Sequence, residues 1–165
     1  MLSVALYEPE IPPNTGNIAR LCAATRVPLH IVGKPSFSLD DRAMRRAGLD
    51  YWPHVTLYQH TDLAALERSL PQARLVLLTT RATRPYTDWV YQPSDCLLFG
   101  PETRGLPAEL LAARADHCLT IPMLNPAVRS LNLATAVSIV LYEALRQLGV
   151  FSKAGAHEWK SAQNL

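Results

Sequence analysis

The sequence predicts an α/β fold in which a mostly parallel β-sheet carries helices on both faces. Short apolar segments of strand length alternate along the chain with segments in which apolar residues recur every three to four positions. This alternation is typical of parallel sheets, because each crossover between parallel strands is long enough to hold a helix. The chain has 165 residues, of which 48% are hydrophobic and 18% charged, so it can form one well-packed domain.

The expected strands are apolar segments bounded by proline, glycine or polar residues, and they lie at 2–7, 29–32, 73–79, 96–100 and 117–121. Helices are expected at 15–25, 40–48, 61–70, 107–115 and 131–148. For the last helix, Ser130 is the expected cap and Gly149 the expected end. We expect one domain over 1–151 and a loosely held tail over 152–165.

The composition favours a cytoplasmic protein. The segment MLSVALYEPE lacks the basic-then-apolar layout of a signal peptide, and no apolar run approaches the ~20 residues that cross a bilayer. Cys22, Cys96 and Cys118 are odd in number and lie in apolar stretches, so we interpret them as buried free thiols. The histidines show no metal-ligand spacing, so no metal is expected; His30 and His117 are expected in strands.

The net charge of +2 is too small to establish a nucleic-acid partner, but 13 of the 16 basic residues are arginine. Arginine is the side chain best suited to bidentate phosphate contact. Arg42, Arg45 and Arg46 cluster within one expected helix and are candidates for RNA binding. An equally good interpretation is that they keep one face of that helix solvated.

The candidate site lies where three expected strands end. The segments 79–84, 100–105 and 122–130 each follow an apolar strand and are rich in glycine, proline, threonine and arginine. Since ligands of parallel sheets bind beyond the carboxyl ends of the strands, we expect these segments to meet at one edge. The glycine-rich loops of dinucleotide and P-loop sites are absent from the sequence, as is the G-x-S-x-G motif of hydrolases.

Three motifs carry most of the functional information. NTGNIARL at 14–21 predicts a capped helix start, with Asn14 or Thr15 as the cap and Arg20 away from the buried stripe. LLFGPETRGLP at 97–107 predicts a strand running into a glycine-rich turn that can approach a ligand closely. IPMLNPAVRSLNLATAVS at 121–138 predicts a strand, an irregular loop and a long helix.

The order of these motifs resembles that of the SPOUT methyltransferases, specifically their ribose 2′-O-methylating SpoU branch. The resemblance extends over roughly 3–148, and it is strongest to small members that modify the wobble cytidine or uridine of leucine tRNAs. It implies S-adenosylmethionine as methyl donor, tRNA as substrate, a homodimer and a trefoil knot in the carboxyl-terminal half. The chain is similar to members without a separate RNA-binding domain.

The resemblance also implies roles for individual residues. The implied cofactor pocket is formed by Leu78, Thr79, Gly100, Glu102, Ile121, Met123, Ser130 and Asn132. The implied catalytic residues are Asn14, Arg20, Ser130 and Asn132. Because a guanidinium is not readily deprotonated in proteins, we interpret Arg20 as holding phosphate and stabilising the attacking oxygen, not as a base.

Three alternatives remain open at this stage. The chain can methylate another tRNA position or ribosomal RNA, or it can be a catalytically silent RNA-binding protein with the same fold. The third is an ordinary nucleotide-binding α/β enzyme, which the missing phosphate-binding motifs disfavour.

Overall fold

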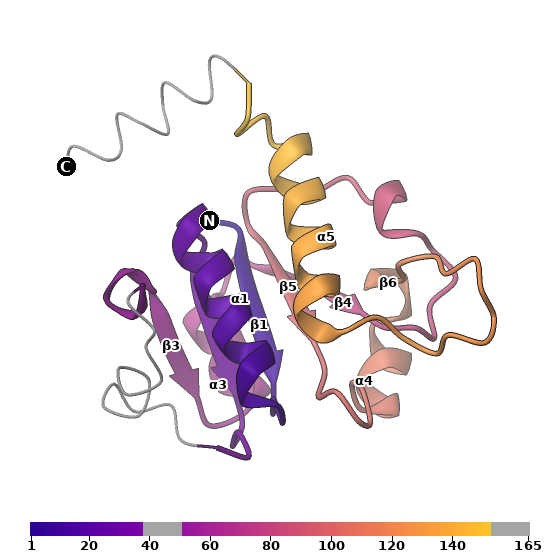
Figure 1. The fold of residues 1–165 in the computed structure, drawn as a ribbon, viewed down its shortest axis with the longest axis horizontal. Helices are drawn as coiled ribbons and strands as arrows, with labels where there is room; N and C mark the ends of the chain where they lie inside the picture. The colour runs from indigo at the N-terminus through magenta and orange to yellow at the C-terminus, as the bar shows by residue number, and fades with distance from the viewer. Residues whose placement is uncertain (38–50, 153–165) are drawn as a thin grey trace.

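The computed structural model describes residues 1–37 and 51–152 and confirms the predicted parallel α/β architecture (Figure 1). Its sheet has six strands in the order β3-β2-β1-β5-β4-β6, and every pair of neighbours is parallel. The strands are β1 (Ser3–Tyr7), β2 (Leu29–Val32), β3 (Leu57–His60), β4 (Arg74–Leu78), β5 (Asp95–Phe99) and β6 (Cys118–Leu119).

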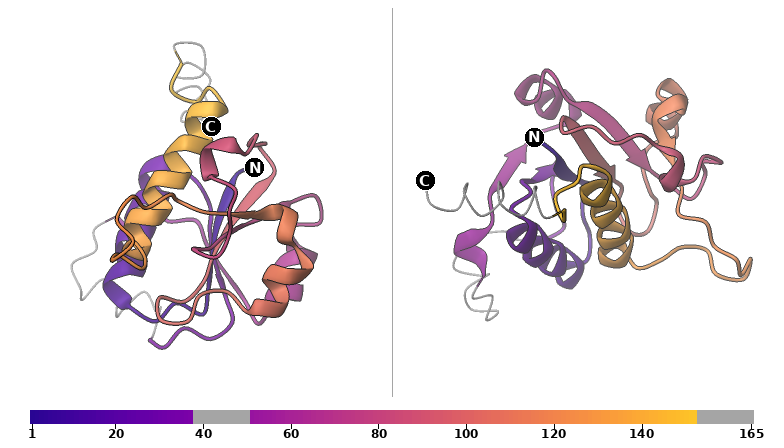
Figure 2. Two further views of the ribbon diagram at one scale, coloured as in Figure 1. Left: turned by 90° about the vertical axis from the view of Figure 1, so that its right-hand side faces the viewer. Right: turned by 90° about the horizontal axis from the view of Figure 1, so that it is seen from above.

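Helices cover both faces of the sheet, as the views in Figure 2 show. The helices are α1 (Pro12–Thr25), α3 (Leu63–Ser69), α4 (Ala108–Ala113) and α5 (Leu133–Gln147), with short 3₁₀ turns at Trp52–His54, Tyr86–Asp88 and Ala115–His117. Alternate residues of β5 enter two hydrophobic cores: Leu97 and Phe99 pack with α1 and α5, whereas Cys96 and Leu98 pack with α3 and α4. This alternation follows from the two-residue period of a strand.

The strand β3 is absent from the sequence-based prediction. Its sequence LYQH is half polar, and it lies at the edge of the sheet with Tyr58 exposed, so it lacks the apolar run that marks the inner strands. The strand expected at 117–121 is present as the shorter β6, but His117 is not part of it, because His117 ends a 3₁₀ turn and β6 begins at Cys118. The expected helix at 40–48 lies outside the described residues, as does the expected tail from 153 onward.

The helix ends correct two predictions about capping. Helix α1 begins at Pro12 with Ile11 as its N-cap residue, so neither Asn14 nor Thr15 caps it. Helix α5 is capped by Asn132 and not by Ser130: the Asn132 side-chain oxygen accepts hydrogen bonds from the amides of Ala134 and Thr135. Gly149 follows α5 with a φ of 73°, the left-handed conformation expected at a helix end.

The order of the strands determines where a ligand site can form. The chain builds β1, β2 and β3 outward in one direction, then returns to place β5 and β4 on the other side of β1. The connections after β1 and β5 therefore diverge, and such a switch point is where open α/β sheets bind ligands. After β6 the chain crosses back to α5, which packs beside α1 (Figure 1). The trefoil knot stays a prediction.

No helix in the parts of the chain that the structure describes is both long and apolar enough to cross a membrane.

Candidate active site

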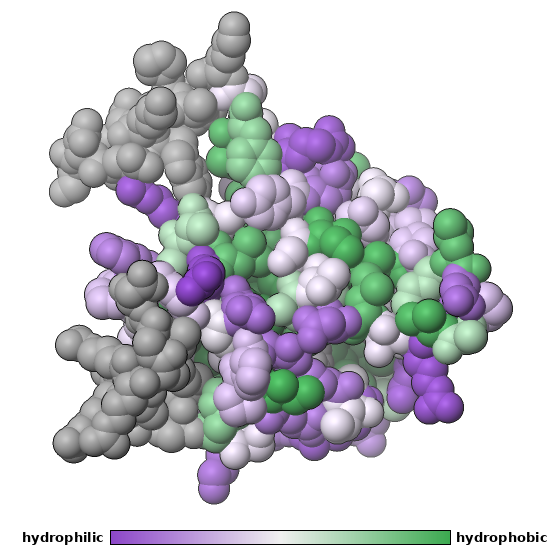
Figure 3. Space-filling view, in the orientation of Figure 1, coloured by the Kyte–Doolittle hydropathy of each residue, from purple (hydrophilic) through white to green (hydrophobic). Residues whose placement is uncertain are grey.

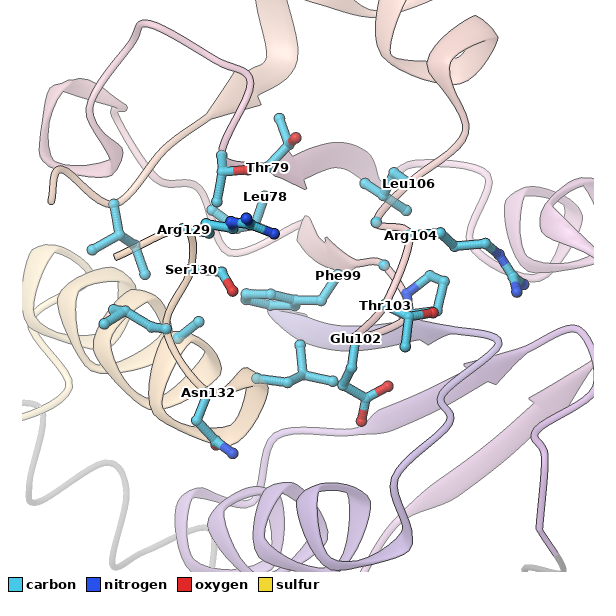
Figure 4. Close-up of a pocket in the computed structure, with 18 of the residues that line it drawn as sticks. Leu78, Thr79, Phe99, Glu102, Thr103, Arg104, Leu106, Arg129, Ser130 and Asn132 are labelled. Atoms are coloured by element: carbon cyan, nitrogen blue, oxygen red, sulfur yellow. The ribbon is translucent and has the colours of Figure 1, made fainter. Parts of the chain in front are cut away.

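A cavity of about 580 Å³ lies at the carboxyl ends of β4, β5 and β6, where the three segments were expected to meet. Its volume is in the range of pockets that hold a cofactor-sized molecule. In Figure 4, Leu78 and Thr79 lie on one side, Glu102 and Asn132 on the opposite side, and Phe99 between them. The predicted residues that line it are Asn14, Leu78, Thr79, Gly100, Glu102, Ile121, Met123, Ser130 and Asn132.

A chain of hydrogen bonds joins the three motifs at one rim of this cavity. The Asn14 side-chain amide donates to Glu102 at 3.1 Å, and its oxygen accepts from the Asn132 amide at 2.8 Å. Asn132 in turn caps α5, as described above. We call the side chains of Glu102, Asn14 and Asn132 the relay. Since Asn14 is buried, both of its polar atoms need partners, and the relay therefore fixes the orientation of its amide.

Glu102 performs a structural task that its position in the sequence does not reveal. Its carboxylate accepts hydrogen bonds from the backbone amides of Glu10 at 2.9 Å and Ile11 at 3.2 Å. These amides precede α1, so the carboxylate also lies close to the positive end of that helix. Glu102 thus holds the segment before α1 against the glycine-rich turn after β5, instead of facing solvent or offering a free carboxylate to the cavity.

The contact between these two segments is reciprocal. Glu10 accepts hydrogen bonds from the backbone amide of Thr103 at 2.9 Å and from its hydroxyl at 2.8 Å. These hydrogen bonds from Thr103 lower the pKa of Glu10 below its usual value, and the charge of Arg104 adds to the effect. Arg104 forms ion pairs with Glu8 and Glu10 and points away from the cavity (Figure 4). Its guanidinium is therefore engaged within the protein.

Gly100 is the point where the turn after β5 folds back most tightly. A Cβ atom at this position would lie 2.4 Å from the Leu106 nitrogen and 2.5 Å from the Gly105 carbonyl carbon. Both are backbone atoms, so only glycine fits without moving the turn. Gly105 supplies the bend itself, with a φ of 69°. The two glycines of the second motif therefore shape the wall of the cavity.

Arg20 does not line the cavity, although it was the leading catalytic candidate. It lies six residues beyond Asn14, about 9 Å along the axis of α1 and about 120° around it. Its guanidinium carbon lies 4.7 Å from the centre of the Tyr51 ring, and the Tyr51 hydroxyl donates to the Gly16 carbonyl at 2.7 Å. The side chain is exposed, so the ring holds it above α1 while its donors remain accessible.

The structure also bears on the predictions about the cysteines, a metal site and the arginine cluster. The three cysteines are free and buried, as expected, and burial raises the pKa of Cys22 to about 12 and that of Cys96 to about 11. Among the residues that the structure describes, no group of three or more potential ligands is placed to hold a metal ion. The candidates Arg42, Arg45 and Arg46 lie outside the described residues.

Besides Arg104, two arginines line the cavity that were not among the predicted site residues. Arg81 follows β4 and Arg129 precedes Ser130, and both side chains are exposed. Arg129 extends toward Leu78 and Thr79 (Figure 4). Their position in two of the three converging segments was a signal in the sequence, because a basic side chain in such a loop points to an anionic ligand.

Comparison with known proteins supports the resemblance seen in the motifs. The profile of the SpoU rRNA methylase family matches residues 1–142. The chain is 54% identical over 151 residues to the tRNA (cytidine(34)-2′-O)-methyltransferase of Escherichia coli strain K12, covering 90% of this chain and 95% of that one.

Solved structures agree with the sequence comparison. A solved structure described as giving structural insights into the 2′-OH methylation of C/U34 on tRNA matches with a TM-score of 0.82 and 49% identity, covering 90% of this chain and 96% of that chain. The AdoMet-bound rRNA methyltransferase of Sinorhizobium meliloti matches with a TM-score of 0.74 and 28% identity, covering 89% of this chain and 56% of that chain.

The fold and the three converging motifs define an RNA methyltransferase of the SPOUT class. The chain belongs to the SpoU rRNA methylase family. The predictions of family, enzyme class and fold are thereby confirmed.

Proposed function

We propose that this chain transfers a methyl group from S-adenosylmethionine to the ribose 2′-hydroxyl of nucleotide 34 of a tRNA. The observation that carries the proposal is the convergence of all three family motifs on one cavity, with Glu102, Asn14 and Asn132 joined directly by hydrogen bonds. The relatives named for position 34 match nearly the full length of the chain, which favours the same substrate here.

The cavity has the chemistry that S-adenosylmethionine requires. Leu78, Phe99 and Ile121 offer apolar surface to an adenine ring, while Thr79 and Ser130 offer hydroxyl groups. The backbone of the turn from Gly100 to Gly105 borders the same space and can approach a ligand closely. When bound there, the cofactor supplies an electrophilic methyl carbon on a sulfonium.

The chain's own residues position the acceptor and stabilise its charge. A ribose hydroxyl is a weak acid, so attack by its oxygen needs removal of the proton or stabilisation of the developing negative charge. In this proposal Arg20 grips the adjacent phosphate and stabilises the attacking oxygen, and that phosphate is available to accept the proton. Tyr51 holds the guanidinium in place, and the relay keeps Asn132 at the cavity rim.

We further propose that the site is completed in a homodimer. Arg20 does not line the cavity of its own chain, so a second copy that packs on α1 can bring its Arg20 toward this cavity. Exposed apolar residues on the same side of the molecule are consistent with such packing: Tyr142 on α5 is 48% exposed and stacks on Phe151, which is 53% exposed. Figure 3 shows apolar surface over α5.

The resemblance adds leucine tRNAs as substrates to the proposal, and the composition adds a cytoplasmic location. A single experiment tests the substrate assignment. The protein is incubated with methyl-labelled S-adenosylmethionine and either total tRNA or ribosomal RNA, and the products are digested and mapped by mass spectrometry. We expect a 2′-O-methylated cytidine or uridine at position 34 of leucine tRNAs. Label confined to ribosomal RNA would show that the proposed tRNA substrate is wrong and that ribosomal RNA is the substrate. No label in either RNA would favour a catalytically silent RNA-binding protein.

A further inference from the structure

A second cavity adjoins the first and has no role in the function proposed so far. Its volume is about 750 Å³, and it lies between the loop after β4, helix α4 and the 3₁₀ turn before β6. The residues that line it are Thr79, Arg81, Ala82, Thr83, Arg84, Ala108, Leu111, Ala112, Ala115, Asp116 and Cys118.

The two cavities share part of one wall. Thr79 and Arg81 line both of them. In the first cavity, Thr79 lies on the side opposite Glu102 and Asn132 (Figure 4), so the second cavity begins beyond that far side. The loop itself is held in place, because the Thr79 hydroxyl accepts a hydrogen bond from the Arg81 amide at 3.2 Å. Because the cavities share this loop, an extended polymer that crosses it, such as an RNA strand, can place one nucleotide in the first cavity and the next nucleotide in the second.

The charged groups of the second cavity favour an anionic ligand. Arg84 is fixed, because it donates to the Asp88 carbonyl at 2.7 Å and stacks on Trp89 at 4.8 Å. The Arg81 guanidinium has no acceptor among the residues that the structure describes, although it is exposed at the boundary between the cavities. Asp116 is the one carboxylate among the described residues of the lining, to which Arg81 and Arg84 contribute two guanidinium groups.

The rest of the lining is small and suits a planar or sugar-like group. Ala108, Ala112 and Ala115 present only methyl groups, which leaves room between α4 and the loop. Thr83 adds a hydroxyl that can pair with a ribose or a base edge. A phosphate held by arginine, beside a small and partly apolar recess, is the combination that a nucleotide needs.

We propose that the second cavity holds the nucleotide next to the one that is methylated, with Arg81 bound to the phosphate that joins the two. This inference rests on the proposed function, because it takes the methylated RNA as the ligand. Arg81 is then a positioning residue: it sets which ribose enters the first cavity without contacting the reacting atoms. Contacts to phosphate and sugar carry little sequence information. This subsite would therefore determine which nucleotide of the RNA enters the first cavity, but it would not favour one base over another.

The first test fills the cavity. Ala112→Trp places a large ring in the recess from an exposed position on α4, and Ala64→Trp on α3 is the matched control, because Ala64 is also exposed and lines neither cavity. We expect Ala112→Trp to raise the KM for tRNA about tenfold, with kcat and the calorimetric Kd for S-adenosylmethionine within twofold of the control. A KM equal to that of the control would overturn the inference.

The second test measures binding and needs no turnover. Anticodon stem-loops carry a neutral methylphosphonate at the phosphodiester on one side or the other of nucleotide 34, and their affinities are measured by fluorescence anisotropy. We expect at least one of the two substitutions to weaken binding to the wild type about tenfold more than it weakens binding to Arg81→Gln, which has already lost that contact; a loss caused by the Arg20 contact is the same on both proteins. Equal losses on both proteins would refute the contact.

The two proposals fail in different ways. If the wild type does not methylate nucleotide 34, the proposed function is wrong, whatever the second cavity does. If the wild type methylates it, and Arg81→Gln responds to both methylphosphonates as the wild type does, only the subsite is wrong.

Discussion

The relay predicts that Asn14 and Glu102 are energetically coupled, and a double-mutant cycle measures this coupling. Glu102→Gln replaces one of the carboxylate oxygens with a donor, so one of the three N–H groups now bound to it loses its acceptor. A hydrogen bond to a charged group contributes about 2 kcal/mol, and the half-buried position of Glu102 keeps the cost near that value. We therefore expect a loss of about 2 kcal/mol in the free energy of unfolding.

Asn14→Asp creates a different conflict at the same contact. A carboxylate oxygen takes the place of the amide nitrogen that now lies 3.1 Å from Glu102, so two like charges face each other. At this separation the repulsion is about 1 kcal/mol in water and grows as solvent is excluded. With the lost hydrogen bond added, we expect this substitution to cost about 2 kcal/mol as well.

The double variant Asn14→Asp with Glu102→Gln restores the contact with donor and acceptor exchanged. The glutamine amide can donate to the new aspartate, which can still accept from Asn132. The pair should then cost about 2 kcal/mol in total instead of about 4, a coupling energy of about 2 kcal/mol. Urea unfolding at one fixed protein concentration, followed by tryptophan fluorescence, measures the free energy of unfolding of the wild type, the two single variants and the double variant.

Matched controls separate the relay from general effects of charge. Asn17→Asp adds the same charge at an exposed position on α1, and Glu109→Gln removes one at an exposed position on α4. Each should change the free energy of unfolding by less than about 0.5 kcal/mol. Additivity of the Asn14 and Glu102 substitutions within about 0.5 kcal/mol would refute the relay as an energetic unit.

Three further predictions concern catalysis, the glycine-rich turn and pH. Arg20→Ala should lower single-turnover methyl transfer at least about 100-fold while calorimetry finds the Kd for S-adenosylmethionine unchanged, whereas the control Arg26→Ala should change neither quantity; wild-type turnover of Arg20→Ala would refute the role given to Arg20. Gly100→Ala should cost about 2 kcal/mol in urea unfolding and weaken cofactor binding, because its Cβ would lie 2.4 Å from backbone; full stability would show that the turn can move. Burial, and then the neighbouring His60, lowers the pKa of His30 to about 4, so the unfolded chain takes up the proton first as the pH falls. Stability should therefore decline between about pH 6.5 and 4 by up to about 1.4 kcal/mol per pH unit, and His30→Phe should flatten this slope, which pH-dependent urea titrations will decide.

The sequence was most informative where hydrophobic burial dictates structure. The inner strands and the apolar stripe of α5 follow the predicted positions closely, because Val137, Val140, Leu141 and Ala144 are all buried in the core. The edge strand β3 was missed for the complementary reason. Its residues are held by hydrogen bonds to β2 more than by burial, and pairing of backbone groups leaves little trace in side-chain pattern.

Most residues that line the cavity were predictable from the sequence, but Arg20 does not line it and the contacts between the residues were not predictable. The three segments could be identified because parallel strands bring their carboxyl ends to one edge. The contacts of Glu102 could not, because its partners Glu10 and Asn14 lie 92 and 88 residues away in the chain. The same holds for Asn132, whose side chain reaches Asn14 across 118 residues; it caps α5 in place of Ser130 because the helix begins at Leu133.

The position of Arg20 shows what a motif alone leaves open. The motif places it about one and two-thirds turns beyond Asn14 on α1, and the helix then directs it away from the cavity onto Tyr51. A catalytic role for Arg20 therefore depends on how RNA and a second copy of the chain approach α1. In the proposal, the homodimer therefore contributes to catalysis, by bringing Arg20 of one copy toward the cavity of the other, and not only to stability.

The most direct test of the whole account is a single-turnover assay on one tRNA prepared in two forms. One form carries the natural ribose at nucleotide 34, and the other carries a 2′-deoxyribose there. We predict rapid transfer of labelled methyl to the first form and none to the second, although both bind with affinities within about threefold, since the loss of one hydroxyl removes at most one hydrogen bond. Transfer to the deoxy form at an equal rate would contradict the account, because the methyl group would then go to an atom other than the 2′-oxygen.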